Sequence, residues 1–119
     1  LLQAIREFNG PPEDPIVASA EAALGKLRVI QDRLPEASML LERALARMEK
    51  QSGGVEIEIA GAKFALAKVR FRLEPGEADR GRALAQVARA SFLRFGAQFQ
   101  GEVTQIDQWL AQLPAPAGG

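Results

Sequence analysis

The chain contains no histidine, no cysteine and no tyrosine among its 119 residues. These absences remove the side chains that most often transfer protons near neutral pH, form thiolate nucleophiles or donate phenolic protons. Zinc, copper and haem also lose their commonest protein ligands. The groups left for chemistry are carboxylates, lysine, arginine, serine and a single threonine. We therefore predict a protein that is not an enzyme and that holds no metal and no cofactor.

An excess of charge of either sign is also lacking. The sequence has 15 Lys and Arg against 15 Asp and Glu, so its formal net charge is zero, and its 47% hydrophobic content is typical of a folded single domain. The charges are unevenly distributed, because residues 63–94 carry eight basic side chains and three acidic ones. A nucleic acid would have to bind this basic segment, since the total charge does not favour such a partner.

No apolar run approaches the roughly 18 residues that a membrane-spanning helix requires. The chain opens with Leu1 rather than methionine, and we expect it to be part of a longer protein. We expect no secretory signal at its start. The cytoplasm is therefore taken as the default location.

Residues 15–51 show the first long helical pattern. Asp14 is a good N-cap, and Pro15 is well tolerated in the first turn of a helix. Apolar residues then recur at alternating spacings of four and three, which is typical of a helix packed along a seam. They are Ile16, Ala20, Ala23, Leu27, Ile30, Leu34, Ala37, Leu41, Ala44 and Met48. Pro35 lies inside this pattern, so we predict either one kinked helix or two nearly collinear helices.

Residues 55–73 are predicted to form a β-hairpin. The first five residues alternate strictly between β-branched and acidic side chains, which indicates a strand. The alternation changes phase near Ala67, as a β-bulge would cause. A helix with Phe64, Ala67 and Phe71 on one face is the alternative that we favour less.

Residues 77–113 show the second long helical pattern, with apolar side chains advancing by about 3.6 residues. Glycine lowers helix propensity, so a break near Gly96 or Gly101 is consistent with this pattern. A short helix is also predicted over residues 1–9. Residues 114–119 are predicted to be a flexible tail rich in Pro, Ala and Gly.

These elements predict a mainly α fold with a small β element (α+β). Residues 1–113 form a single helical-hairpin domain, in which two long antiparallel helices are joined by the β-hairpin. Each long helix would measure about 55 Å, and the pairing would place Ala23 opposite Ile106. Such a pair leaves apolar side chains uncovered, so we expect a homo-oligomer, most simply a dimer that forms a four-helix bundle.

The candidate partner-binding residues are the basic side chains on and after the predicted hairpin. They are Lys63, Lys68, Arg70, Arg72, Arg80 and Arg82. Together with neighbouring phenylalanines they could follow a phosphate backbone. The alternative is that the basic residues of the hairpin pair across strands with Glu56 and Glu58.

Our leading functional hypothesis is a non-catalytic, homo-oligomeric interaction protein that acts as an adaptor, a scaffold or an assembly subunit. The alternative function is nucleic-acid binding through the basic residues.

Overall fold

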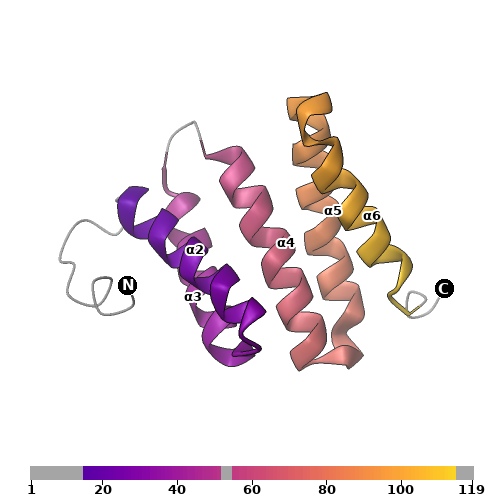
Figure 1. Ribbon diagram of the computed structural model, residues 1–119, viewed down its shortest axis with the longest axis horizontal. Helices are drawn as coiled ribbons and strands as arrows, with labels where there is room; N and C mark the ends of the chain where they lie inside the picture. Colours follow the sequence, from indigo (N-terminus) through magenta and orange to yellow (C-terminus); the bar gives the residue numbers. More distant parts are fainter. Residues whose placement is uncertain (1–14, 52–54, 115–119) are drawn as a thin grey trace.

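The computed structural model describes residues 15–51 and 55–114. Within these residues, five α-helices follow one another, and each packs against the next (Figure 1). They are α2 (Pro15–Ile30), α3 (Leu34–Met48), α4 (Glu56–Leu73), α5 (Ala78–Phe95) and α6 (Gln100–Ala111), with the 3₁₀ turns η1 (Pro75–Glu77) and η2 (Ala97–Phe99). The helix predicted over residues 1–9, and the predicted tail beyond Pro114, lie outside the described residues.

Helix α4 occupies the centre of the molecule. Helices α2 and α3 pack on one side of it, and α5 and α6 lie on the other side (Figure 1). The longest dimension is 46 Å, and the other two are 31 and 23 Å. The fold is therefore shorter and broader than two rods of about 55 Å would be.

The predicted β-hairpin over residues 55–73 is wrong, because this segment forms the 18-residue helix α4, and no strand occurs in the described residues. The α+β fold class is corrected accordingly to an all-helical fold for the described part of the chain. The strand prediction failed because the segment is buried on two opposite faces. On a helix, residues two positions apart point about 200° apart, so two buried faces produce a strand-like alternation. One face packs against α3 and contains Ile59, Ala62, Leu66 and Val69. The opposite face packs against α5 and α6 and contains Ile57, Ala60, Phe64 and Ala67.

Two features of the α4 sequence favour a helix over a strand. Acidic residues occupy its first turn and basic residues its last turn, which stabilises the helix dipole. Its middle is rich in alanine, which favours helices and is depleted in strands. The less favoured helical alternative is therefore confirmed. The rings of Phe64 and Phe71 both pack against Trp109 of α6 in T-shaped arrangements, with centroid distances of 5.8 and 6.1 Å.

The split at Pro35 is confirmed, but the two resulting helices are not collinear. Pro35 lies in the first turn of α3, where its missing N–H costs no helical hydrogen bond. Asp32 adopts a left-handed conformation with φ of 62°, and α3 then folds back along α2 (Figure 1). The buried face predicted for the α3 half is correct, whereas in α2 Leu27 and Ile30 are 42% and 82% exposed.

The true buried face of α2 contains a carboxylate and a glycine, which explains why the apolar pattern missed it. Glu21 is 0% exposed, and Arg47 Nε donates a hydrogen bond to its Oε1 at 2.6 Å. Arg43 Nε lies 3.1 Å from Oε2 as an ion pair without hydrogen-bond geometry. Gly25 is also buried, because α3 approaches it closely at Leu41. Two guanidinium groups of α3 thus compensate the burial of one charge on α2.

The single helix predicted over residues 77–113 is wrong, but the break considered at Gly96 is confirmed. Gly96 has a φ of 111°, a conformation that favours glycine, and α6 folds back along α5 after it. Arg89 joins the two helices by hydrogen bonds to both carboxylate oxygens of Asp107, at 2.6 and 3.2 Å. The predicted pairing of Ala23 with Ile106 is also wrong, because Ala23 is exposed and Ile106 is buried with α4 and α5.

The four-helix bundle proposed for a dimer depended on each chain supplying two long helices. Since the described residues of one chain form five shorter helices that cover one another, that architecture is corrected. Self-association itself stays a prediction, which light scattering can test.

The crossing of α2 and α3 at Gly25 provides a first test. A Cβ atom there would lie 2.9 Å from Leu41 Cγ and 3.4 Å from Leu40 Cβ, and both leucines are fully buried. We expect Gly25→Ala to lower the free energy of unfolding by about 1 kcal/mol, because overpacking outweighs the gain in helix propensity. Gly101→Ala is the matched control, since no atom lies within 4 Å of its added methyl group. Urea unfolding should show the control to be equal to or more stable than the original chain; a stabilised Gly25→Ala would contradict the close crossing.

The buried carboxylate provides a second test. We expect Glu21→Gln to lower the free energy of unfolding by roughly 2 kcal/mol, because it removes the negative charge that Arg43 and Arg47 face. Glu42→Gln is the control, since its ion pair with Arg70 is exposed and contributes less than about 1 kcal/mol. Thermal and urea unfolding of the two variants measure the difference. Equal losses of unfolding free energy in the two variants would show that the buried carboxylate of Glu21 contributes no more to stability than the exposed one of Glu42.

Candidate functional site

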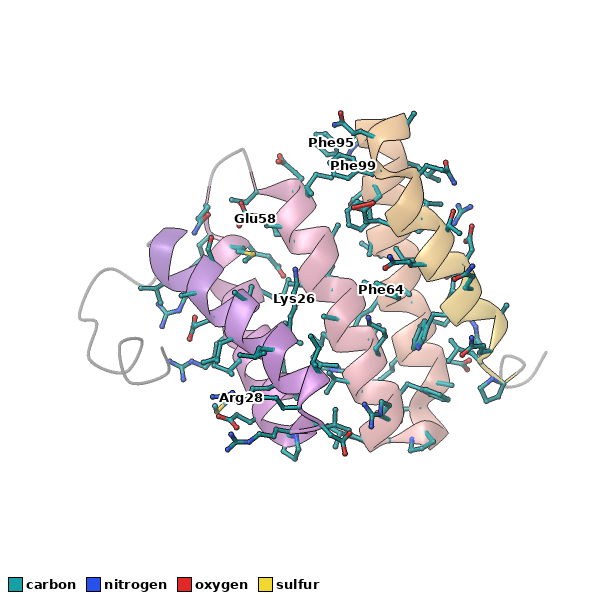
Figure 2. The ribbon with its side chains drawn as sticks, in the orientation of Figure 1. Lys26, Arg28, Glu58, Phe64, Phe95 and Phe99 are labelled. Carbon is teal, nitrogen blue, oxygen red and sulfur yellow. The ribbon has the colours of Figure 1, made fainter. Side chains whose placement is uncertain are left out.

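A groove runs between α2 and α6, with α4 as its floor, and it is more enclosed than the second groove between α4 and α5 described below. We call it the lysine groove, and its volume is about 280 Å³. Its lining comes from four helices. The residues are Lys26, Val29, Ile30, Gly61, Phe64, Ala65, Lys68, Phe92, Glu102 and Gln105. Figure 2 shows Lys26 and Phe64 in the middle of the molecule, away from Phe95 and Phe99 at the junction of α5 and α6.

Lys68 is the central charged group of the lysine groove. It lies one helical turn after Phe64 on α4, and its Nζ is 4.5 Å from the centroid of the Phe64 ring. The side chain is half-buried. Burial lowers the pKa of Lys68 from its ordinary value, and the positive charge of Lys26 lowers it further. The ammonium group is therefore partly desolvated and faces a like charge across the groove.

Lys26 approaches the groove from α2. A Cβ atom at Gly61 would lie 3.2 Å from Lys26 Nζ, so the missing side chain leaves room for the ammonium over α4. No sequence pattern relates Lys26 to Lys68, because Lys26 lies in the more acidic part of the chain, on another helix. Sequence reasoning therefore missed this residue. Only the packing of α2 on α4 brings the two cations together.

The remaining walls of the lysine groove are mostly apolar. Val29 and Phe64 contribute aliphatic and aromatic surface, the buried Phe92 lies beneath them, and Ile30 stands 82% exposed at the rim. Glu102 of α6 is the acidic residue in the lining. Every ion pair within residues 15–51 and 55–114 has an arginine as its cation, so neither lysine of the groove has a carboxylate at ion-pair distance there.

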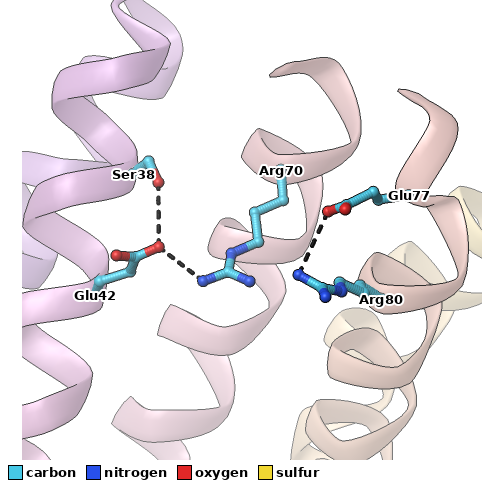
Figure 3. Close-up of polar contacts among 5 residues, drawn as sticks. All are labelled: Ser38, Glu42, Arg70, Glu77 and Arg80. Carbon is cyan, nitrogen blue, oxygen red and sulfur yellow. Dashed lines mark hydrogen bonds and ion pairs between the residues drawn. The ribbon is translucent and has the colours of Figure 1, made fainter. Parts of the chain in front are cut away.

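The four arginines predicted as partner contacts all have acidic partners within the chain. Arg70 Nη2 lies 2.7 Å from Glu42 Oε1, and Arg80 Nη1 lies 3.5 Å from Glu77 Oε2 (Figure 3). Arg72 pairs with Asp32. Arg82 pairs with Asp79 and donates to the carbonyl of Pro114. Much of the basic charge of residues 63–94 is therefore compensated internally.

The expected partners of these cations were nevertheless wrong. Glu56 and Glu58 lie at the start of α4, so they cannot pair across strands with Arg70 and Arg72 near its end. Glu58 instead accepts a hydrogen bond from Ser19 Oγ at 3.1 Å. Lys63 lies on α4 outside the lysine groove. Of the six predicted residues, the structure brings only Lys68 into this groove; their role as nucleic-acid or partner contacts stays a prediction.

A second, more open groove lies between α4 and α5. It is lined by Leu66, Arg70, Arg80, Ala83, Leu84 and Val87. Both of its arginines are engaged by the glutamates shown in Figure 3, so its charge is already balanced. The second groove therefore offers apolar surface without an unbalanced charge to select a partner.

The described helices lack two other kinds of site. Within the described ranges, no three acidic side chains gather closely enough to hold a metal ion. None of the helices there combines the length and the apolar character needed to cross a bilayer. The lysine groove is therefore the arrangement from which we argue a function.

The lowered pKa of Lys68 predicts a pH-dependent effect on stability. Folding is penalised in full while the half-buried ammonium is protonated, and the penalty falls as pH rises from the lowered pKa of the folded state to the ordinary lysine pKa of the unfolded state. We expect Lys68→Met to raise the free energy of unfolding by a few tenths of a kcal/mol near neutral pH, since solvent screens a half-exposed charge. The gain should shrink as pH approaches the ordinary lysine pKa. Urea unfolding across this pH range measures it.

Lys63→Met, on the same helix but outside the groove, controls for the effect of adding methionine to α4. A gain for Lys68→Met that grew with pH would contradict the desolvation of Lys68.

No protein-family model, no curated protein and no solved structure matches this chain. The function of the lysine groove is therefore argued from its own residues.

Proposed function

We propose that the chain is a non-catalytic interaction protein, acting as an adaptor, a scaffold or an assembly subunit. Its lysine groove receives an acidic, amphipathic helical segment of a partner protein. The observation that carries this proposal is the pair of lysines, Lys26 and Lys68, which stand over an apolar floor without a carboxylate at ion-pair distance among the described residues.

Charge selects the kind of partner. Two ammonium groups close enough for one to lower the pKa of the other repel each other, and a carboxylate between them would relieve that repulsion. Four arginines of α4 and α5 already have acidic partners and lie outside the lining of the lysine groove, so a negative ligand gains most at the lysines. Glu102 on the α6 wall disfavours a ligand that is negative along its whole length. An isolated Asp or Glu within an otherwise apolar segment fits this charge pattern.

The apolar floor supports a helical segment. Amphipathic helices bind in grooves by inserting side chains spaced three or four residues apart. Phe64 and Val29, which are partly buried, provide surfaces for such side chains, and the exposed Ile30 extends the apolar surface to the rim. Aromatic residues at the centre of an interface commonly provide much of its binding energy.

Nucleic-acid binding is the alternative, because phosphate groups would also meet the two lysines. Three observations favour the protein partner. Arg70 and Arg80 are paired with glutamates and lie outside the lysine groove, the groove lining includes Glu102, and Phe64 is half-buried with Lys68 over its ring rather than free to stack on a base. A second copy of this chain is the other competing occupant. Both alternatives become outcomes of the binding test.

A designed peptide of roughly 15 residues, about the length at which an isolated helix becomes stable, tests the proposal. It carries leucines at helical spacing with glutamates beside them, and a matched peptide carries glutamine in place of each glutamate. Trp109, the single tryptophan, touches Phe64 of the groove and reports binding by fluorescence. We expect the acidic peptide to bind in the micromolar range. Lys68→Gln should weaken binding about fivefold, equivalent to roughly 1 kcal/mol, because it removes one ion pair.

Lys26→Gln should show a similar loss, whereas Lys63→Gln is the matched control and should bind as the original chain does. Equal binding of the acidic and glutamine peptides, or of all three variants, would overturn the proposal. Tighter binding of single-stranded DNA, lost steeply with salt, would favour the nucleic-acid alternative. Light scattering of the chain alone measures self-association, and a dimer that blocks the peptide would identify a second copy as the occupant.

A further inference from the structure

Lys68 differs in surroundings from the other three lysines of the sequence, Lys26, Lys50 and Lys63. We propose that Lys68 is a covalent capture site, whose amine condenses with aldehydes that carry a flat apolar group and an anionic group. This inference uses the lysine groove but does not require the protein partner proposed above.

The geometry of the groove supports capture at this amine. Lys68 Nζ stands 4.5 Å from the centroid of the Phe64 ring, within a cavity of about 280 Å³ whose walls include Phe92 and Val29. A planar apolar group that enters the groove can therefore lie against the apolar lining around Val29 and Ile30 while its carbonyl carbon is held near the amine. Such positioning raises the rate of a reaction between two groups, because it replaces a free encounter by a held one.

The reactivity of Lys68 follows from the same surroundings. An amine is nucleophilic only when it is neutral, and a desolvated lysine beside another cation is a recognised arrangement for activating it. Burial and Lys26 both lower the pKa of Lys68. The charged groups that line the groove around it are Lys26 of α2 and Glu102 of α6, while α5 contributes the uncharged Phe92. Burial is the larger cause of the lowered pKa, and the positive charge of Lys26 adds to it.

The condensation is balanced without any further reactant. The neutral amine nitrogen of Lys68 attacks the carbonyl carbon, and a proton passes from nitrogen to the carbonyl oxygen to form a carbinolamine. The C–O bond then breaks, the hydroxyl group leaves as water with the second amine proton, and a C=N bond forms. One aldehyde and one amine therefore yield one imine and one water, and nothing is oxidised or reduced.

Lys26 is the residue that selects the anionic group. Its ammonium reaches over α4 at Gly61 and has no carboxylate at ion-pair distance in the described part of the chain. A carboxylate on the aldehyde can therefore pair with Lys26 while the carbonyl meets Lys68. We assign Lys26 as a positioning residue, because it acts through the bound anion and not on the reacting carbon.

The test uses the full chain and para-carboxybenzaldehyde, with cyanoborohydride to reduce the imine to a stable amine. Peptide mapping by mass spectrometry then gives the label on each lysine and, separately, on the terminal amine. Near neutral pH we expect Lys68 to carry at least about fivefold more label than Lys63, because the groove concentrates the aldehyde at this amine. Lys26→Gln should reduce labelling by unsubstituted benzaldehyde somewhat, because the pKa of Lys68 rises without the neighbouring charge, and should reduce labelling by the carboxylated aldehyde more, because the pairing with the carboxylate is lost as well.

Lys68→Arg keeps the positive charge and removes the nucleophile, and it should lose the preferential label while retaining helical circular dichroism. Uniform labelling of the four lysines, labelling of the terminal amine alone, or an equal effect of Lys26→Gln on both aldehydes would overturn the inference. The acidic peptide should still bind Lys68→Arg, since the guanidinium also pairs with carboxylates. Failure of capture with peptide binding intact, or the reverse, therefore tells the two proposals apart.

Discussion

Helix α4 is buried on two opposite faces, and the other described helices are arranged around it. One face meets α3 and the other meets α5 and α6, so a single element joins two hydrophobic clusters. Small side chains permit this arrangement. Gly81 of α5 lies so close to α4 that a Cβ atom there would be 3.2 Å from the backbone oxygen of Ala67. Close approach of backbones then leaves the larger rings of Phe64 and Trp109 to fill the space at the edge of the interface.

The charged residues divide by type between structure and the candidate site. Arginines hold the helices together, as Arg47 does at the buried carboxylate of Glu21 and Arg89 does at Asp107. The planar guanidinium suits such paired contacts with carboxylates. Lys26 and Lys68 instead face the groove without an acidic partner among the described residues. Two uncompensated cations beside apolar surface cost stability, and proteins commonly retain such costs where they bind something.

The sequence predicted where the helices are interrupted better than it predicted how they pack against one another. Proline and glycine act locally, so the interruptions at Pro35 and Gly96 could be read directly. The direction of the chain after each interruption could not, because the reversal at Asp32 depends on tertiary contacts between α2 and α3. For the candidate site, Lys68 was identified as one of six basic residues, but Lys26 was not. Composition can show that a segment is basic. It cannot show which of its basic side chains are neutralised by acidic side chains that lie beside them in the fold.

The sequence by itself determined the helical character of residues 15–51, the buried face of α3 and the lack of thiol, imidazole and phenol groups. The tertiary structure alone decided that α4 (Glu56–Leu73) is buried on two opposite faces, that Glu21 is buried and that Lys26 meets Lys68. The physical reason is the same in each case. Periodicity shows which residues share a face, whereas the number of neighbours around a helix decides how many of its faces are buried and which charges find partners there.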